Sequence, residues 1–412
     1  MSQSSRRTQF LVIFLTILLS TIGFGVCIPV LPKYAQEFGA SDFVAGLLTG
    51  VFSLMVFIAA PLWGRLSDRI GRRPVLIVSI LGSAVGYFIM GWAGDAKLLP
   101  FLFLARIIDG ASGGNVGAAQ AYLADISTKE ERSRAMALIG IAFGAGFVLG
   151  PALAGVLHSF WPQSLSLPFY VVGVMCLLNA LFVFTSVPES LPPERRRTSH
   201  TELPLSDLLR HADSKLYLKA VATYFTSLAA FSIMTQDFTL FGTTRFQLTV
   251  GEMSYVMAAI GVVGILVQGG MLRRLLPKYG EPVLARFGMW VLLASFILLP
   301  MVSGMGTLLA VSCLIAVGNS FVQPTLNGLA SASVEPEWQG RAMGFLQGIA
   351  SLGRGIGPIL GGWLLGLDRD AQGVPTAHYG RTPFWVAALL IVVTLLIARG
   401  LHKPASPEGA RP

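Results

Sequence analysis

The chain has 412 residues, of which 53% are hydrophobic and only 12% are charged. Soluble domains carry roughly 25% charged residues, so this composition excludes an ordinary soluble protein and indicates one that crosses a membrane. The formal net charge of +9 requires no nucleic-acid partner, because cations at a membrane surface are attracted to anionic lipid.

Long apolar runs follow one another along the whole chain. A helix needs about 20 mostly apolar residues to span a hydrocarbon core that is ~30 Å thick. Bilayers otherwise admit only closed β-barrels, whose strands are alternating segments of about ten residues and do not match these runs. We therefore predict an all-α membrane protein with twelve transmembrane helices, at 10–31, 43–63, 74–94, 98–124, 135–157, 168–187, 215–240, 252–272, 283–302, 306–330, 341–365 and 381–400.

The predicted loops divide Lys and Arg residues unevenly. If the N-terminus is inside the cell, 23 cations lie on the inner side, 5 on the outer side and 2 within helices. Cytoplasmic loops collect Lys and Arg, so the asymmetry predicts that both termini are cytoplasmic.

The loop after the second predicted helix reads GRLSDRIGRRP, at 64–74, and holds four arginines and one aspartate. Gly64 and Gly71 permit a sharp turn there, and arginines at headgroup level are attracted to anionic lipid by ~1 kcal/mol each. Asp68 adds a second interpretation, because a carboxylate can hold arginines or a helix N-terminus in one conformation and release them in another. The loop is therefore either a topological anchor or a gate.

Four ionisable residues lie inside the predicted helices, where a charge costs at least ~2.5 kcal/mol and is usually functional. Arg106 and Asp109 are three residues apart on one helix face, so they either neutralise each other or couple transport to protons. Asp237 is either an interfacial residue or a proton carrier in a central cavity. An unpaired Arg354 would be costly, so we expect it to face the cavity and to meet Asp237, Asp109 or an anionic substrate.

Polar residues within the helices are candidates for the lining of the same cavity, and packing between helices is the alternative for each. They are Asn115, Gln120, Gln236, Asn319, Gln323, Asn327 and Gln347. The three cysteines have no metal-ligand spacing, and no nucleotide-binding or catalytic motif is recognisable. We expect neither a metal nor a cofactor, and no enzymatic activity.

The fifth and eleventh predicted helices repeat one another. Residues 134–157 align without a gap to 341–364, and nine of the 24 positions are identical. The chain therefore consists of two like halves, which we place at 1–187 and 215–400, with a polar linker at 188–214 and a tail at 401–412. Paired six-helix halves are a known plan of transporters, with the substrate site near the bilayer midplane.

Small residues in the fifth predicted helix allow close contact with another helix, and Gly-Pro bends a helix. We expect a helix interface along Gly140, Gly144, Gly150, Pro151 and Gly155.

Three motifs in chain order resemble those of the major facilitator superfamily. The loop 64–74 is similar to the signature between helices two and three, and the matching residues are Gly64, Asp68, Arg69, Gly71, Arg72 and Arg73. LARIIDGASGG, with Arg106 and Gly110, resembles the fourth-helix motif, and GIAFGAGFVLGPALAG resembles the fifth-helix motif of proton-coupled exporters. Together with AYLADISTKEERSRAM, the pattern looks most like the twelve-helix drug:proton antiporters, especially the tetracycline-efflux branch.

The resemblance implies two pseudo-symmetric six-helix bundles in the plasma membrane, the inner membrane in bacteria. It also implies a gate at Asp68, with Asp125 and Arg134 as partners, and a functional arginine at Arg106. The function implied is proton-coupled export of a small drug-like compound, as in antibiotic resistance, by a monomer whose partners are substrate, protons and lipid.

One departure weakens the tetracycline comparison. Ser20 and Gly86 stand where tetracycline exporters carry acidic residues in helices one and three. An apolar or amphiphilic compound, or one with negative charge near Arg354, fits as well. The alternative function is a proton-independent facilitator, or a lipid or metabolite transporter of the same fold.

Overall fold

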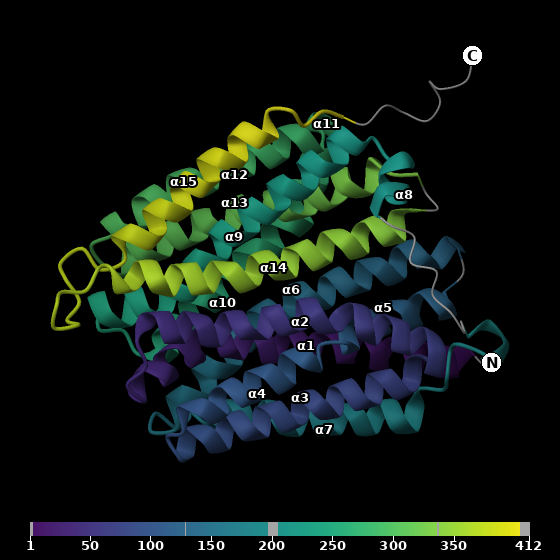
Figure 1. Cartoon of the computed structure of the whole chain (residues 1–412), viewed down its shortest axis with the longest axis horizontal. Coiled ribbons are helices and arrows are strands. Elements are labelled where there is room, and N and C mark those ends of the chain that lie inside the picture. The colour runs from purple at the N-terminus through teal and green to yellow at the C-terminus, as the bar shows by residue number, and fades with distance from the viewer. Residues whose placement is uncertain (1–2, 128, 197–204, 336–337, 404–412) are drawn as a thin grey trace. The chain divides into compact units, whose positions relative to one another are not determined.

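The computed structural model describes residues 3–127, 129–196, 205–335 and 338–403. These residues contain no strand, only the isolated bridges Ala212–Val334 and Arg369–Pro375. The helices, drawn in Figure 1, are α1 (Gln3–Glu37), α2 (Asp42–Ile70), α3 (Arg72–Asp95), α4 (Leu99–Ala111), α5 (Asn115–Ile126), α6 (Lys129–Phe160), α7 (Leu167–Ser186), η1 (Pro193–Arg195), α8 (Leu205–Arg210), α9 (Ser214–Arg245), α10 (Val250–Leu266), the π-helical turn η2 (Val267–Leu272), α11 (Arg273–Tyr279), α12 (Glu281–Leu298), η3 (Leu299–Met301), α13 (Met305–Ala332), α14 (Gln339–Gly366) and α15 (Arg381–Ala398).

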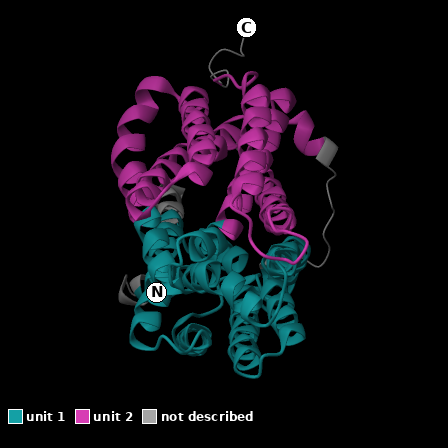
Figure 2. Cartoon of the chain, turned by 90° about the vertical axis from the view of Figure 1, so that its left-hand side faces the viewer, with its two compact units in different colours: residues 1–200, 238–261 teal, residues 201–237, 262–412 magenta. Residues whose placement is uncertain are grey.

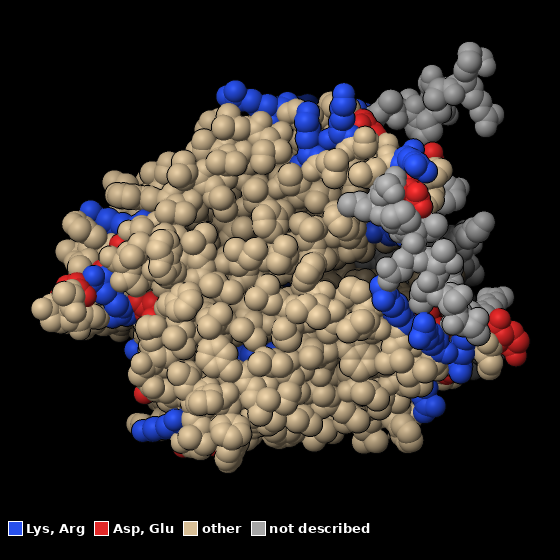
Figure 3. Space-filling model, viewed as in Figure 1, with Lys and Arg blue, Asp and Glu red and all other residues tan. Residues whose placement is uncertain are grey.

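Each of the twelve predicted ranges overlies these helices, and one range is broken; several helices extend up to seven residues beyond a predicted end, for example α1 and α2. Ten helical segments of the described chain are long and apolar enough to cross a membrane. The other two predicted spans are the broken one, which forms α4 and α5, and α14, which is rich in glycine and contains Arg354. On the face drawn in Figure 3, charged side chains lie at the helix ends, and the surface between them is almost uncharged. This is the distribution expected of a multi-pass membrane protein.

Residues 1–200 and 238–261 form one compact unit, unit 1, which is teal in Figure 2. Within it α1 packs along α6, and α3 packs against α4 and α7. The α1–α6 contact is close because glycines meet there: a Cβ added to Gly150 would lie 2.7 Å from the Cα of Gly25.

Residues 201–237 and 262–412 form the second compact unit, unit 2, which is magenta in Figure 2. In it α12 packs against α13 and α15. Val267, Leu272, Leu284 and Phe321 form a buried cluster that joins the π-helical turn to α12 and α13. The contacts place the end of α9 and most of α10 in unit 1, whereas the predicted division assigned all of 215–400 to the C-terminal half.

Side chains cap several of the helices, α2 and α15 among them. The Ser41 hydroxyl accepts a hydrogen bond from the backbone N–H of Val44 at the start of α2, at 3.3 Å. The buried Asp368 carboxylate accepts the backbone N–H groups of Gly380 and Thr382 at the start of α15, at 2.9 and 3.1 Å. Both satisfy N–H groups that a helix leaves without an internal partner.

Candidate functional site

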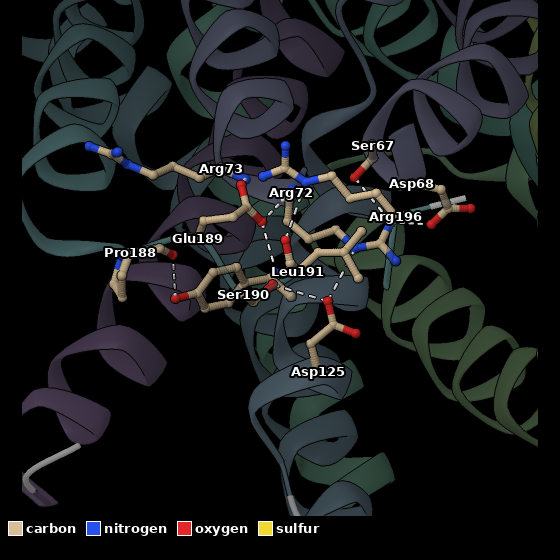
Figure 4. Close-up of polar contacts among 11 residues, drawn as sticks. Ser67, Asp68, Arg72, Arg73, Asp125, Pro188, Glu189, Ser190, Leu191 and Arg196 are labelled. Carbon is tan, nitrogen blue, oxygen red and sulfur yellow. Dashed lines mark hydrogen bonds and ion pairs between the residues drawn. The ribbon is translucent and has the colours of Figure 1, made fainter. Parts of the chain in front are cut away.

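Arg72, the first residue of α3 and part of the predicted loop 64–74, is paired with two carboxylates (Figure 4). A guanidinium nitrogen of Arg72 lies 2.6 Å from Asp68 Oδ1, and its Nε lies 3.2 Å from Asp125 Oδ2. Arg72 also donates to the Ser67 hydroxyl, at 3.2 Å. The predicted gate residues Asp68, Arg72 and Asp125 are therefore brought together around one guanidinium.

Only one of the two glycines makes the turn in this loop. Gly71 has φ = +110°, a backbone conformation that is costly for side-chain-bearing residues, and it separates α2 from α3. Gly64 lies inside α2, where a Cβ would meet nothing within 4 Å, so the predicted turn at Gly64 is wrong. The helix continues through it because one glycine costs a helix only about 1 kcal/mol.

Glu189, in the predicted linker, is a member of this site that the sequence did not reveal. Its carboxylate accepts the backbone N–H groups of Arg72, at 2.8 Å, and of Arg73, at 3.1 Å. It thus caps the N-terminus of α3, where Gly71 has no side chain to do so. A Cβ on Gly71 would collide with the Glu189 carboxylate. The one signal was an acidic residue just after a predicted helix.

Further bonds fix the segment after α7 to the same site. The Tyr122 hydroxyl donates to the Pro188 carbonyl, at 2.9 Å, and the Ser190 hydroxyl donates to Asp125, at 3.0 Å. The Arg73 guanidinium donates to the Phe184 carbonyl, at 2.6 Å. The network therefore connects α2, α3, α5 and the end of α7 within unit 1. Arg69 is exposed, and the side chain of Arg134, the other predicted partner, lies outside the described residues.

Arg106 and Asp109 form a buried ion pair on α4. Arg106 Nη1 lies 3.2 Å from Asp109 Oδ2, and the two residues are only 1% and 4% exposed. The guanidinium carbon lies 4.2 Å from the centre of the Phe52 ring, a cation–π distance. Two further nitrogens, Nε and Nη2, are buried without a hydrogen-bond partner among the described residues. The predicted local pair is thus present, and part of the guanidinium is left unsatisfied.

The fourth predicted helix is not continuous, contrary to the predicted span 98–124. It ends at Ala111 and resumes at Asn115. Gly113 and Gly114 lower the helix propensity there, and a Cβ on Gly114 would collide with the Trp63 ring. The Trp63 indole donates to the Ala111 carbonyl, at 2.5 Å, and thereby satisfies a group that the break exposes.

Asn115 starts α5 and is one of the predicted cavity residues. Its side-chain NH2 donates to the hydroxyl of Ser20 on α1, at 2.8 Å. Ser20 is one of the two positions at which the sequence departs from the resemblance to tetracycline exporters, and here it takes part in a neutral hydrogen bond.

Asp237 and Arg354 do not meet within unit 2. Asp237 is fully buried in α9, and its carboxylate faces Gly361 of α14, where an added Cβ would lie 2.6 Å from Oδ2. Arg354 lies about two turns earlier in α14, is partly exposed and donates to the Ser351 hydroxyl, at 3.1 Å. No described carboxylate of unit 2 forms an ion pair with it. The expected contact with Asp237 is therefore absent.

The other predicted cavity residues have varied surroundings. Gln323 donates to Asn319 one turn earlier on α13, at 3.1 Å. Gln236 is buried with both amide atoms unpartnered among the described residues, as is the side-chain oxygen of Asn327. Gln120 is partly buried and Gln347 is exposed.

The glycine-rich helix α6 contacts different neighbours along its length. Gly150 lies against α1, as described above. Gly155 faces α10, where an added Cβ would lie 3.3 Å from the Cβ of Ser254, and Ser159 is hydrogen-bonded to Tyr255 at 3.0 Å. Gly140 has open space beside it, so it lies at no helix contact. Unit 1 therefore includes a seam between α6 and α10.

Ten long apolar helices of the described chain and a buried ion pair on α4 define a polytopic α-helical membrane protein. The profile of the Major Facilitator Superfamily matches residues 13–358 and 278–412, and the chain belongs to this family. Its members are transporters, so the chain is not an enzyme.

Curated relatives span nearly the whole chain. Major facilitator superfamily domain-containing protein 10 of Mus musculus is 29% identical over 98% of this chain and 94% of its own length. Tetracycline resistance protein, class C, of Escherichia coli is 30% identical over 85% of this chain and 88% of its own. The crystal structure of the human organic anion transporter MFSD10 superposes with a TM-score of 0.70 at 25% identity, covering 95% of this chain and 99% of that one.

Proposed function

We propose that the chain exports small amphiphilic compounds from the cytoplasm in exchange for protons, by alternating access. The family, the two six-helix halves expected from the internal repeat and the tetracycline-resistance relatives support this direction. The cation asymmetry supports an orientation with both termini in the cytoplasm and a place in the plasma membrane. We expect the monomer to be the working unit.

The observation that carries proton coupling is the buried pair of Arg106 and Asp109. Two opposite charges in a dry interior are stable only while both are ionised and paired. Protonation of the Asp109 carboxylate would leave the guanidinium without its counter-ion and drive it towards another acceptor. Each proton taken up or released at Asp109 would therefore change the packing of α4 against the Phe52 ring.

The network around Arg72 would act as the gate of the same cycle. Asp68, Asp125 and Glu189 together hold one guanidinium and one helix N-terminus, so breaking any of these contacts would loosen α2 from α3. Asp237 is our second candidate for the proton carrier, because it is a fully buried carboxylate on α9.

A second candidate function is transport of an organic anion without obligatory proton coupling. Arg354 favours it, because this cation of α14 pairs with no described carboxylate of unit 2. The relationship to an organic anion transporter supports it too. A lipid or metabolite carried by facilitated diffusion belongs to the same alternative.

Transport by purified protein in proteoliposomes, with and without an imposed pH gradient, tests these functions. We expect movement of tetracycline-like and anionic probe dyes to follow the pH gradient in the parent, and Asp109→Asn to lose that dependence while it keeps exchange of substrate at equal pH. Glu194→Gln, at an exposed carboxylate, is the control. Movement indifferent to the gradient in the parent would reject antiport, and full activity of both Asp237→Asn and Arg354→Ala would reject these two residues as site residues.

A further inference from the structure

Three exposed cations lie at the end of the long helix that comprises α10, the π-helical turn and α11. They are Arg273, Arg274 and Lys278, and none forms an ion pair with a described residue. The next acidic residue, Glu281, faces Gly328 of α13, where an added Cβ would lie 3.5 Å from its Cγ. These cations therefore have no anion within the described protein.

The corresponding loop of unit 1 is different. There Arg72 is paired with Asp68 and Asp125, so its charge is compensated inside the protein. The α11 cations follow the eighth predicted helix, the position equivalent to that of Arg72 after the second. They are exposed, and no carboxylate of the described protein compensates their charge. A partner from outside the chain would supply the missing negative charge.

The length of the helix places these cations at the membrane surface. Val250–Tyr279 comprises 30 residues, which span about 45 Å at a rise of 1.5 Å per residue. The hydrocarbon core is only ~30 Å thick, so about ten residues extend beyond it. With the start of the helix at Val250 taken as the opposite edge of the core, α11 falls at the level of the phospholipid headgroups.

The π-helical turn just before these cations has two adjacent glycines on an exposed, apolar surface. Leu266 is 66% exposed and Met271 is also exposed, whereas a Cβ added to Gly269 or Gly270 would meet nothing within 4 Å. Both glycines lie in the π-helical turn, and such turns are frequent at functional sites. An apolar surface with an open strip thus leads up to the three cations.

We propose that α11 and the π-helical turn form a binding site for one anionic phospholipid. Arg273, Arg274 and Lys278 bind the phosphate, for which guanidinium groups supply paired donors. The glycerol backbone and the start of an acyl chain lie along Gly269 and Gly270. The site is independent of the transported substrate and of proton coupling.

Native mass spectrometry of the full-length protein, titrated with dioleoyl-phosphatidylglycerol or dioleoyl-phosphatidylcholine, measures the preference. We expect at least tenfold tighter binding of the first bound phosphatidylglycerol than of phosphatidylcholine. Arg273→Gln/Arg274→Gln should reduce the ratio to about two, and Lys33→Gln/Lys97→Gln, which removes two cations from unit 1, should leave it unchanged. If the double variant does not fold, the single variants should each reduce the ratio about twofold.

Two further measurements distinguish a lipid from a free phosphate and test the glycine strip. Millimolar glycerol 3-phosphate should not displace the lipid, and Gly270→Leu, which has room in the protein, should weaken lipid binding at least fivefold. Equal affinity for the two lipids, or an unchanged ratio in the arginine variants, overturns the proposal. Displacement of the lipid by glycerol 3-phosphate also overturns it. If Gly270→Leu binds the lipid as tightly as the parent protein, the acyl chain does not lie along the glycines.

Discussion

Carboxylates fix both polar sites of unit 1. Asp109 compensates Arg106 in the interior, and the sequence reveals the pair because the two residues share one helix face. Glu189 caps α3 from a position 117 residues away from Arg72, a contact that no local pattern predicts. Its place in a polar segment made it indistinguishable from an ordinary solvated residue. Local spacing therefore predicts the first site and misses half of the second.

The cap at Glu189 predicts a specific loss of stability. Glu189→Ala would leave the backbone N–H groups of Arg72 and Arg73 without their acceptor, which costs about 1–2 kcal/mol. Urea titration of the protein in mixed micelles measures the free energy of unfolding. Glu194→Ala, in the exposed turn η1, is the control and should change it by less than about 0.5 kcal/mol.

Gly71 provides a check on the same contact. Gly71→Ala brings a Cβ against the Glu189 carboxylate and also strains a positive φ. In the Glu189→Ala background the collision is gone and only the backbone strain remains, about 1–3 kcal/mol. An equal cost of Gly71→Ala in both backgrounds would show that the two residues do not touch.

Helices differ in how well the sequence predicts them. The twelve apolar runs predict the spans because length and hydrophobicity alone decide whether a segment can cross lipid. The break at Gly113–Gly114 is missed because it lies within such a run and depends on Trp63, which belongs to α2. At Gly64 the sequence predicts a turn that the structure does not have, because α2 tolerates one glycine between good helix formers. Whether a glycine breaks a helix thus depends on what packs against it.

The broken helix predicts that two neighbouring glycines respond differently to the same change. Gly114→Ala forces a Cβ into the Trp63 ring, and overpacking of this kind costs about 1–3 kcal/mol. Gly117→Ala has open space and gains helix propensity, so it should be neutral or up to about 1 kcal/mol stabilising. The midpoint of thermal unfolding in detergent orders the two variants. A lower midpoint for Gly117→Ala than for Gly114→Ala contradicts the packing described at Trp63.

At the scale of the whole chain, the contacts divide it at other places than its internal repeat suggests. The repeat predicts halves at 1–187 and 215–400, and the contacts assign 238–261 to unit 1. The reason is the seam at which Gly155 and Ser159 of α6 meet Ser254 and Tyr255 of α10. A sequence repeat shows which helices correspond to one another. It does not predict which helices are in contact, because such contacts depend on the conformation of the transporter.

The seam predicts an efficient cross-link. The Cβ positions of residues 155 and 254 are 3.3 Å apart, close to the ~3.5–4.5 Å of disulfides, so Gly155→Cys/Ser254→Cys should oxidise readily. If α6 and α10 must separate during transport, oxidation should reduce efflux at least tenfold, and a reductant should restore it. The single-cysteine variants are the controls, because they reveal any cross-link to the native cysteines, of which Cys27 and Cys176 are buried and Cys313 is partly exposed. Unimpaired efflux by the cross-linked protein would exclude movement at this seam.

The passage of α9 from unit 2 into unit 1 at Asp237–Phe238 also limits how the protein can be recombined. A chimaera that exchanges everything after the linker with a related sequence would import foreign residues at 238–261 and set them against the native α6. Exchanging 201–237 and 262–412 while keeping the native hairpin should preserve that fit. Successful hybrids are therefore expected to carry two crossovers near these boundaries in addition to the one in the linker.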